Sequence, residues 1–146
     1  MTTDYQKIRA AIEGPILTAF NSQIPPVPVY FDNITFVPPD PPSEYVRVNL
    51  TFGMMTEATL VDILDRARGA LVVRCFAEKN KGPARCQELV STASSVIKTI
   101  SRAPKMEEEV FVKTFDISGP SFPTESNIPH FVARVECSWM ATLYCA

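Results

Sequence analysis

The feature that most constrains the fold of this chain is a long alternation of apolar and polar residues from His130 to Cys145. The odd-numbered positions after His130 are all apolar: Phe131, Ala133, Val135, Cys137, Trp139, Ala141, Leu143 and Cys145. The even-numbered positions include the polar residues His130, Arg134, Glu136, Ser138 and Thr142. Because successive side chains of a β-strand point to opposite faces of its sheet, the pattern predicts one long strand with a buried face and a solvent-facing one.

The apolar face of that strand needs a cover, and residues 84–100 are the best candidate. The apolar residues that recur there at three- and four-residue steps are Leu89, Val90, Ala93, Val96, Ile97 and Ile100. This spacing places them on one side of a helix, so a core of helix packed on sheet is predicted. The residues expected to lie close together and buried in that core are Trp139, Val135, Leu89, Val96 and Ile97.

The other predicted elements surround this pair. A first helix is expected from about residue 4 to 21, with a kink or break at Pro15, which cannot donate a hydrogen bond to Ala11. Residues 24–42 hold seven of the 13 prolines. This density favours an extended arm with a short edge strand at 27–30. Further strands are expected at 45–52, 70–76 and 110–117, with a loop at 119–129. Pro83 suits the first position of the second helix, and Pro104 closes it.

Residues 53–68 admit two interpretations. The segment LVDILDRA is locally helix-like, but the two flanking strands could instead run on and meet in a hairpin, which we favour. The predicted fold class is then α+β: a mostly antiparallel sheet of four to five strands with two helices packed on one face, plus a projecting Pro-rich arm and a hairpin arm. The chain has 146 residues. This length suits a single domain, 1–146, that needs no disulfide or metal to stay folded.

Composition narrows the classes of function. The chain holds 46% hydrophobic and 21% charged residues, which is ordinary for a soluble protein. No apolar run approaches the roughly 18 residues of a membrane span, and no apolar signal-peptide core is present. We therefore expect no membrane partner and a protein that stays in the cytoplasm where it is made. The net charge is −2 and the 14 basic residues are scattered along the sequence. That distribution argues against a general nucleic-acid binder, and no sequence-specific nucleic-acid partner is expected.

No motif for catalysis, a metal or a cofactor is present. The cysteines Cys75, Cys86, Cys137 and Cys145 form no C-x-x-C pair, and His130 is the only histidine. Reduced buried thiols are therefore expected, and no cofactor. His130 and Cys137 fall on opposite faces of the predicted strand, which opposes a Cys-His nucleophile. Trp139 on the apolar face is expected to be a core aromatic.

The order of these landmarks resembles the tail terminator, or tail-to-head joining, proteins of tailed bacteriophages. The matching landmarks are a first helix beginning Tyr5, Ile8, Arg9, then IPPVPVYFDNITFVPP, the strand from Tyr45 to Phe52, RARGALVVRCF at 66–76, Gly82 and Ala84 before the second helix, and IPHFVARVECSWMA at 128–141. The resemblance covers nearly the whole chain and rests on order and spacing. LVDILDRA is more helix-like than the hairpin of that family.

The resemblance implies a non-enzymatic virion protein of the tail or neck, assembled in the host cytoplasm. Such a subunit closes into a ring, typically a homo-hexamer, that caps the tail tube, ends its growth and joins it to a head-side connector or stopper protein. The implied partners are therefore other copies of the chain, the tail tube protein and the connector, with room for genome DNA to pass through the ring. The alternatives are another phage neck or minor tail adaptor, or a small monomeric binding domain.

Surplus apolar and charged residues in the two arms suggest where copies of such a ring would meet. The predicted inter-subunit residues are Tyr30, Phe36, Arg47, Met54, Met55, Leu60, Asp62, Ile63, Asp65 and Arg66. Arg68 belongs with these charges, which are either ordinary surface residues or pairs across a boundary. Glu107, Glu108 and Glu109 are either a solvated turn or acidic residues that line a ring lumen or a docking surface.

Two other classes of function remain as hypotheses. A small ligand-binding or enzymatic domain would need a pocket with convergent polar groups. A monomeric adaptor would bind a partner peptide along an exposed sheet edge.

Overall fold

The computed structural model describes residues 4–23, 26–32, 44–57, 64–78, 83–102, 110–122 and 130–144. Its elements are α1 (Asp4–Asn21), β1 (Val29–Tyr30), β2 (Tyr45–Glu57), β3 (Leu64–Glu78), α2 (Ala84–Arg102), β4 (Val110–Thr114), β5 (Ser118–Ser121) and β6 (His130–Tyr144). One six-stranded sheet has the order β1-β2-β3-β6-β4, with β5 paired to β6. All its pairs are antiparallel except β1 with β2. The predicted α+β class is confirmed.

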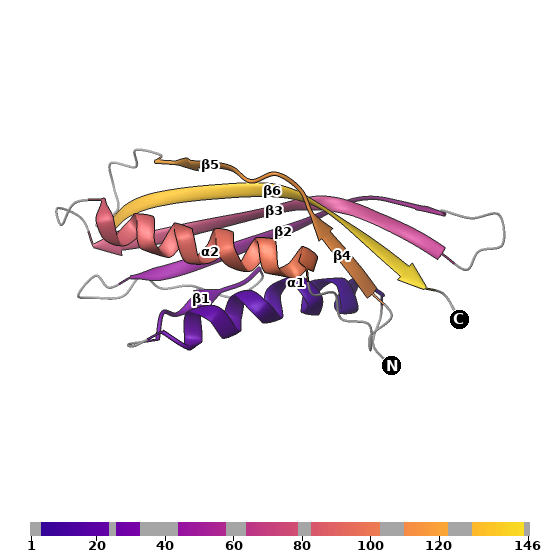
Figure 1. Cartoon of the computed structure of the whole chain (residues 1–146), viewed down its shortest axis with the longest axis horizontal. Helices are drawn as coiled ribbons and strands as arrows, with labels where there is room; N and C mark the ends of the chain where they lie inside the picture. Colours follow the sequence, from indigo (N-terminus) through magenta and orange to yellow (C-terminus); the bar gives the residue numbers. More distant parts are fainter. Residues whose placement is uncertain are drawn as a thin grey trace.

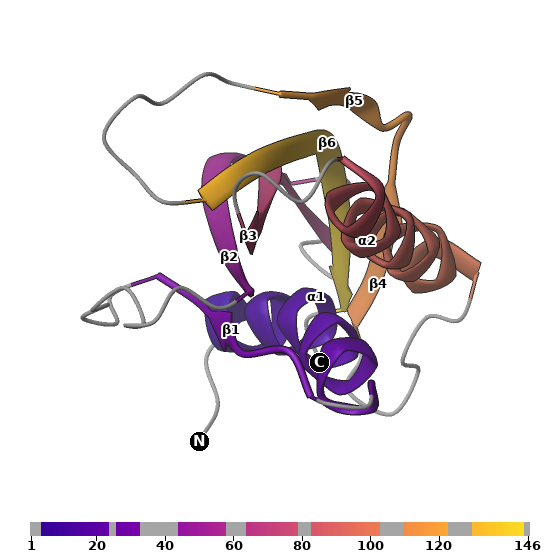
Figure 2. The ribbon, with the colours of Figure 1, turned by 90° about the vertical axis from the view of Figure 1, so that its left-hand side faces the viewer.

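The sheet curls around the two helices, which lie together on one side of it (Figures 1 and 2). Strand β6 alternates as predicted, with Ala133, Val135, Cys137, Trp139 and Ala141 buried against the helices. Its first residues depart from the pattern, because His130 and Val132 are buried although they point the other way. A second apolar cluster forms there, in which Val132 joins Tyr45 and Phe76, whose rings stack at 4.3 Å.

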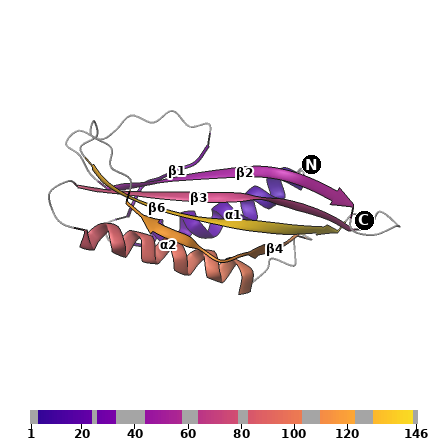
Figure 3. The same cartoon turned by 90° about the horizontal axis from the view of Figure 1, so that it is seen from above.

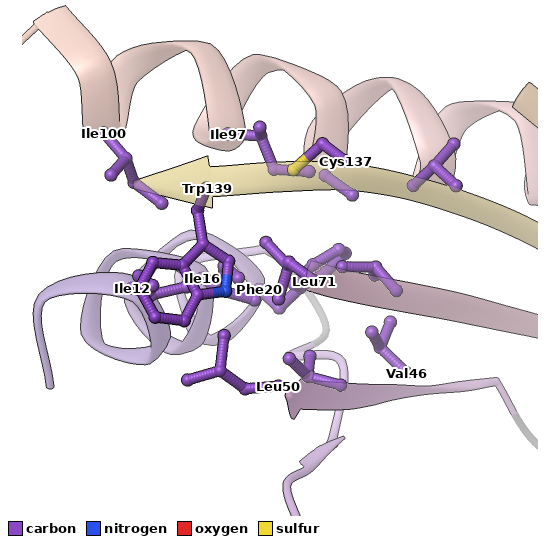
Figure 4. Close-up of a cluster of buried hydrophobic side chains, with 14 of the residues drawn as sticks. Ile12, Ile16, Phe20, Val46, Leu50, Leu71, Ile97, Ile100, Cys137 and Trp139 are labelled. Carbon is purple, nitrogen blue, oxygen red and sulfur yellow. The ribbon is translucent and has the colours of Figure 1, made fainter. Parts of the chain in front are cut away.

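The main core lies between the sheet and both helices (Figure 4). Trp139 is its largest fully buried side chain, at 1% exposure, and it belongs to the same buried cluster as Ile12 and Ile16 of α1 and Ile97 of α2. The predicted core of Trp139, Val135, Leu89 and Ile97 is confirmed. Val96 is only partly buried at the rim of this core, so its placement in the centre was wrong.

Helix α1 continues through Pro15, so of the predicted kink or break, the break does not occur. Four residues at helical spacing, Ile8, Ile12, Ile16 and Phe20, are all fully buried. Losing one backbone hydrogen bond at the proline costs less than exposing the apolar residues on either side of it would. The second helix begins at Ala84, and the carbonyl of Pro83 accepts its first hydrogen bond from the N–H of Gln87 at 3.0 Å, so Pro83 caps the helix rather than starting it.

Strand β2 continues past Gly53 to Glu57, and β3 begins at Leu64 and pairs with that extension, as the hairpin interpretation expects. After an irregularity between Phe52 and Met55 the register continues through Met55 with Ala67 to Glu57 with Asp65, and residues 58–63 lie outside the described part. Strand β6 accompanies β3 along its whole length, so β3 is paired on both sides. This end of the sheet extends beyond both helices (Figures 1 and 3).

Strand β5 lies where a loop was predicted, and β4 ends at Thr114, earlier than predicted. In β5, Ser118 pairs with Glu136 and Ser121 with Arg134, along the same edge of β6 that β4 occupies farther on. Ser-Gly-Pro-Ser has low strand propensity, and proline is tolerated only on an edge strand, so nothing in the local sequence indicated it. All of β5 is exposed.

Candidate functional site

The structure describes only some of the residues predicted at a subunit boundary. Phe36, Leu60, Asp62 and Ile63 lie outside the described residues, as do Glu107, Glu108 and Glu109. The backbone alone is described for Met54, Met55 and Asp65, which lie in β2 and β3. The residues with described side chains are Tyr30 and Arg47, both half-buried, and Arg66, which is exposed.

The described part of the Pro-rich arm lies along its own domain. The Tyr30 ring packs edge-to-face on Tyr45 at 6.0 Å, and the carbonyl of Pro28 accepts a hydrogen bond from the N–H of Val46 at 2.9 Å. Asp32 then accepts hydrogen bonds from the Leu50 N–H at 3.0 Å and the Asn49 side chain at 2.7 Å. As far as Asp32, this arm therefore does not project, and residues 33–43 lie outside the described part.

Arg9 links α1 to Asp32. Its guanidinium donates to Glu13 at 2.7 Å and to Asp32 at 3.0 Å, and it lies 5.5 Å from the centre of the Phe52 ring. Burial would raise the pKa of Asp32, but the hydrogen bonds from Leu50, Asn49 and Arg9 outweigh it and lower that pKa. For Glu13 burial dominates and raises the pKa. This network is structural, since it joins α1 and β2 through Asp32, which follows β1.

The face of the sheet that points away from the helices gathers five arginines, which we call the arginine face: Arg47, Arg66, Arg68, Arg74 and Arg134. Arg47 of β2 is opposite Arg74 of β3, and Arg74 is opposite Arg134 of β6, so these three form one row across three strands. Residues directly opposite on neighbouring strands have Cβ atoms about 5 Å apart, and like charges there are destabilising.

Few described carboxylates balance this face. On strands β2, β3 and β6, the acidic residues that share this face with the arginines are Glu78 and Glu136. Glu136 forms an ion pair with Arg134 at 3.0 Å. Within the described residues, Arg66, Arg68 and Arg74 form no hydrogen bond or ion pair, and the buried Nε of Arg134 has no partner. Basic residues that are scattered along the sequence are therefore brought together by strand pairing, which the sequence interpretation missed.

Three of the four cysteines lie among the described residues, and their burial agrees with the prediction. Cys75, Cys86 and Cys137 are free and buried, and burial raises the pKa of Cys86 and of Cys137 to about 11. The sulfur of Cys86 donates to the carbonyl of Cys75 at 3.3 Å. His130 lies with Tyr45 on the other face of the sheet from Cys137, and Cys145 lies outside the described residues. Among the described residues no group of His, Cys, Asp or Glu is arranged to hold a metal ion.

An open groove of about 740 Å³ runs between α2 and the β4–β5 edge. Lys98 of α2 and Lys113 of β4 line it, and both are exposed. Phe115 lies in the same groove, with its ring centre 5.6 Å from the Lys113 ammonium. An enclosed ligand site would surround its polar groups with apolar walls, whereas this groove is open to solvent and its lysines are solvated. It therefore gives the ligand-binding hypothesis little support.

Comparison with known proteins identifies the fold but no function. No protein-family model matches the sequence, and no curated protein matches it. Among 27 similar chains of solved structures, one aligns with a TM-score of 0.60 over 99% of both chains at 18% sequence identity. At that identity the likeness concerns the fold alone. Neither described helix is long and apolar enough to cross a membrane.

Proposed function

We propose that this protein is a structural subunit of a tailed bacteriophage, a tail terminator that closes into a ring on the end of the tail tube. The ring, typically a hexamer, ends tube growth and presents the surface that a head-side connector joins. The resemblance in the order of sequence landmarks supports this proposal. The subunit works by assembly, without catalysis, in the tail or neck of the virion.

The observation that carries the proposal is the length of the sheet relative to its helical cover. Strand β3 has 15 residues and α2 has 19 residues. A strand of that length spans roughly 50 Å, because each residue adds about 3.3 Å. The helix spans only roughly 28 Å, because each of its residues adds about 1.5 Å. Roughly 20 Å of sheet therefore lies beyond α2. Helix α1 covers the part of that length near Phe52, whose ring meets Tyr5 at 5.2 Å, and the remainder extends past both helices (Figure 1).

The uncovered length lies at the β2–β3 end of the sheet (Figure 3). An extension of this kind provides a patch for a neighbouring subunit. A ring needs two different patches that meet head to tail. We place one of them at this end, where Met54, Met55, Leu60 and Ile63 are the apolar residues and Asp62 and Asp65 the acidic ones.

The second patch must come from another part of the subunit. Tyr30 packs on its own domain, so it contributes less than the sequence predicted. Each boundary between two subunits should bury at least about 1,000 Å² in total, as specific interfaces do.

Mass measurement of the purified protein, alone and mixed with tail tubes, tests the proposal. The expected result is a closed oligomer, a fixed multiple of 16.2 kDa, that binds one end of the tube. Asp62→Lys/Asp65→Lys should leave a folded subunit that fails to cap tails, giving tubes of uncontrolled length in electron micrographs. Lys98→Glu/Lys113→Glu, in the groove on the helical side, serves as the control and should cap normally. A protein that stays monomeric with and without tubes would contradict the ring.

The monomeric adaptor is the second candidate, and the exposed strand β5 favours it. This strand lies at a sheet edge with all its residues exposed. A partner peptide could therefore add a strand beside it. A monomeric mass together with binding of a peptide, abolished by Ser121→Pro, would support this function over the ring.

A further inference from the structure

We infer that the arginine face binds the phosphate backbone of double-stranded DNA, whatever the base sequence of that DNA. The inference rests on the proposed function for the source of the duplex, which is the genome that passes through the ring. The scatter of the basic residues along the chain argued against a nucleic-acid partner. That reason no longer holds, because strand pairing gathers five arginines on one surface.

Strand β3 supplies the arginines that are free to bind a ligand. Arg66 and Arg68 are exposed, Arg74 is half-buried, and none of the three has a hydrogen-bond or ion-pair partner among the described residues. Because residues at even spacing along a strand share one face, the three lie in line on the same surface. They span about 26 Å, since each residue of a strand adds about 3.3 Å. Duplex DNA carries one negative charge per about 1.7 Å of its axis, so a strip of this length meets many phosphates.

The two other arginines add positive charge at one end of this strip. Arg47 and Arg134 are opposite Arg74 on the two neighbouring strands. Arg134 forms an ion pair with Glu136 at 3.0 Å, and Arg47 has an interaction of its own. We therefore count only the three arginines of β3 as phosphate ligands. A phosphate at Arg74 would still be stabilised by the like charges beside it, because an anion among them relieves their mutual repulsion.

The other side chains of the arginine face favour phosphates over a protein partner. Protein interfaces gain most of their affinity from large apolar or aromatic anchors. In the described part of the chain, the exposed large hydrophobic residues are Tyr5, Leu17, Phe115 and Phe122. None of them belongs to the strands that form this face, where Val72 and Met140 are half-buried. Ser138 lies opposite Ala70 there, and Thr142 lies opposite Arg66. Hydroxyl groups of this kind commonly donate to phosphate oxygens.

A duplex fits this face better than a single strand does. Proteins that hold single strands without sequence preference stack the bases on aromatic side chains. The aromatic residues on this side of β2 and β3 are Tyr45 and Phe76, and both are buried in the second apolar cluster. They are therefore not available for stacking. Contacts to phosphates alone carry no direct sequence information, which is why we expect binding to be independent of sequence.

The net charge of −2 does not prevent such binding. Salt limits the reach of a charge to about 8 Å at physiological ionic strength. The carboxylates that contact the helices are paired, Glu13 with Arg9 and both Glu44 and Glu88 with Arg85. A phosphate at β3 therefore interacts mainly with the arginines beside it, and the overall charge keeps the affinity modest.

Fluorescence anisotropy of a short labelled DNA duplex, titrated with the purified wild-type protein, tests the inference. Three phosphate contacts predict that the logarithm of the association constant falls with the logarithm of the salt concentration with a slope of about −2.7. Binding should then be about 40-fold weaker at about 200 mM salt than at about 50 mM. Two duplexes of unrelated sequence should bind equally well.

Matched variants assign the binding to this face. Arg66→Gln/Arg68→Gln should reduce the slope to about −0.9 and weaken binding in low salt at least about tenfold. Both side chains are exposed, so the melting temperature should stay close to that of the wild type. Lys98→Gln/Lys113→Gln removes the same amount of charge from the groove on the helical side and should leave the slope unchanged.

A wild type that binds no duplex in low salt would overturn the inference and leave the ring proposal, which is tested by mass, intact. Equal losses in the arginine and lysine variants would overturn the assignment to the arginine face. An oligomer that Arg66→Gln/Arg68→Gln dissociates, with no DNA binding by the wild type, would instead assign the face to a neighbouring subunit. Arginine-dependent DNA binding by a protein that stays monomeric on tail tubes would support the DNA site and remove the ring.

Discussion

Gly69 should be the least replaceable glycine of the central strands. It lies opposite Phe52 on one side and Trp139 on the other, and those two rings meet edge-to-face at 5.4 Å. A Cβ added to Gly69 would overlap the carbonyl oxygen of Thr51 and lie 2.5 Å from Cζ2 of Trp139. Because the Thr51 oxygen is part of the backbone, no change of rotamer removes the overlap, and β2 and β3 would have to separate locally.

The expected cost of Gly69→Ala follows from that geometry. Overpacking a well-packed core costs about 1 to 3 kcal/mol, and a clash with backbone belongs at the upper end. At about 2 to 4 °C per kcal/mol for a domain near this size, the melting temperature should fall by roughly 6 to 12 °C. Circular dichroism measures the fall, and because Trp139 is the single tryptophan, its fluorescence reports the displaced indole directly.

Gly53→Ala is the matched control on the neighbouring strand. Its added Cβ would lie 3.1 Å from the carbonyl oxygen of Arg68, at an exposed position. We expect that substitution to cost less than about 1 kcal/mol. If Gly69→Ala melted no lower than Gly53→Ala, the indole could not be packed over the glycine as described, and the argument would be wrong.

Three further predictions concern the core, the thiols and the Asp32 junction. Only Ile97 of the pair Val96 and Ile97 is fully buried. Ile97→Ala should therefore lower the free energy of unfolding by about 2 to 4 kcal/mol and Val96→Ala by about 1 kcal/mol or less in urea titrations, and equal losses would contradict the core. Cys86 and Cys137 have pKa values raised to about 11. Both should resist a disulfide reagent at about pH 8 until urea is added, and rapid native labelling of either would reopen the case for an enzyme. The pKa of Asp32 is lowered in the folded state, so Asp32→Asn should destabilise the fold at neutral pH. The stabilisation by Asp32 is present above about pH 4 and is lost as the pH falls through the folded pKa. Wild type and variant should therefore converge in acid, and a constant difference down to about pH 2 would exclude this linkage.

The elements whose apolar residues recur with a regular period were predictable from the sequence. The alternation along β6 and the helical spacing of Leu89 and Ile97 reflect burial on one face, and both elements have the expected partners. No break occurs at Pro15 because the backbone preference of one proline is weaker than the burial of Ile12 and Ile16 on either side of it. Strand β5 was missed because it is held by pairing with β6 and not by its own residues.

The arginine face was beyond such prediction for a different reason. Arg47, Arg74 and Arg134 lie far apart in the sequence, and only the register of two strand pairs makes them neighbours. Each arginine alone looks like an ordinary polar residue on the solvent-facing side of a strand. The like-charge row appears only when the strands are aligned, so a scan for clusters along the sequence does not find it.

The position of β6 has a consequence for how the chain is made. It follows every other described strand in the sequence, yet it lies inside the sheet, between β3 and β4. During translation β3 must wait until α2, β4 and β5 have been made before its second partner exists, as the pairs Glu78 with His130 and Leu64 with Tyr144 show. Pairing between such distant segments is slow, and an unpaired apolar edge is prone to aggregation until it closes. Productive folding should therefore begin only after β6 leaves the ribosome, and chaperones would have that interval in which to hold the nascent chain.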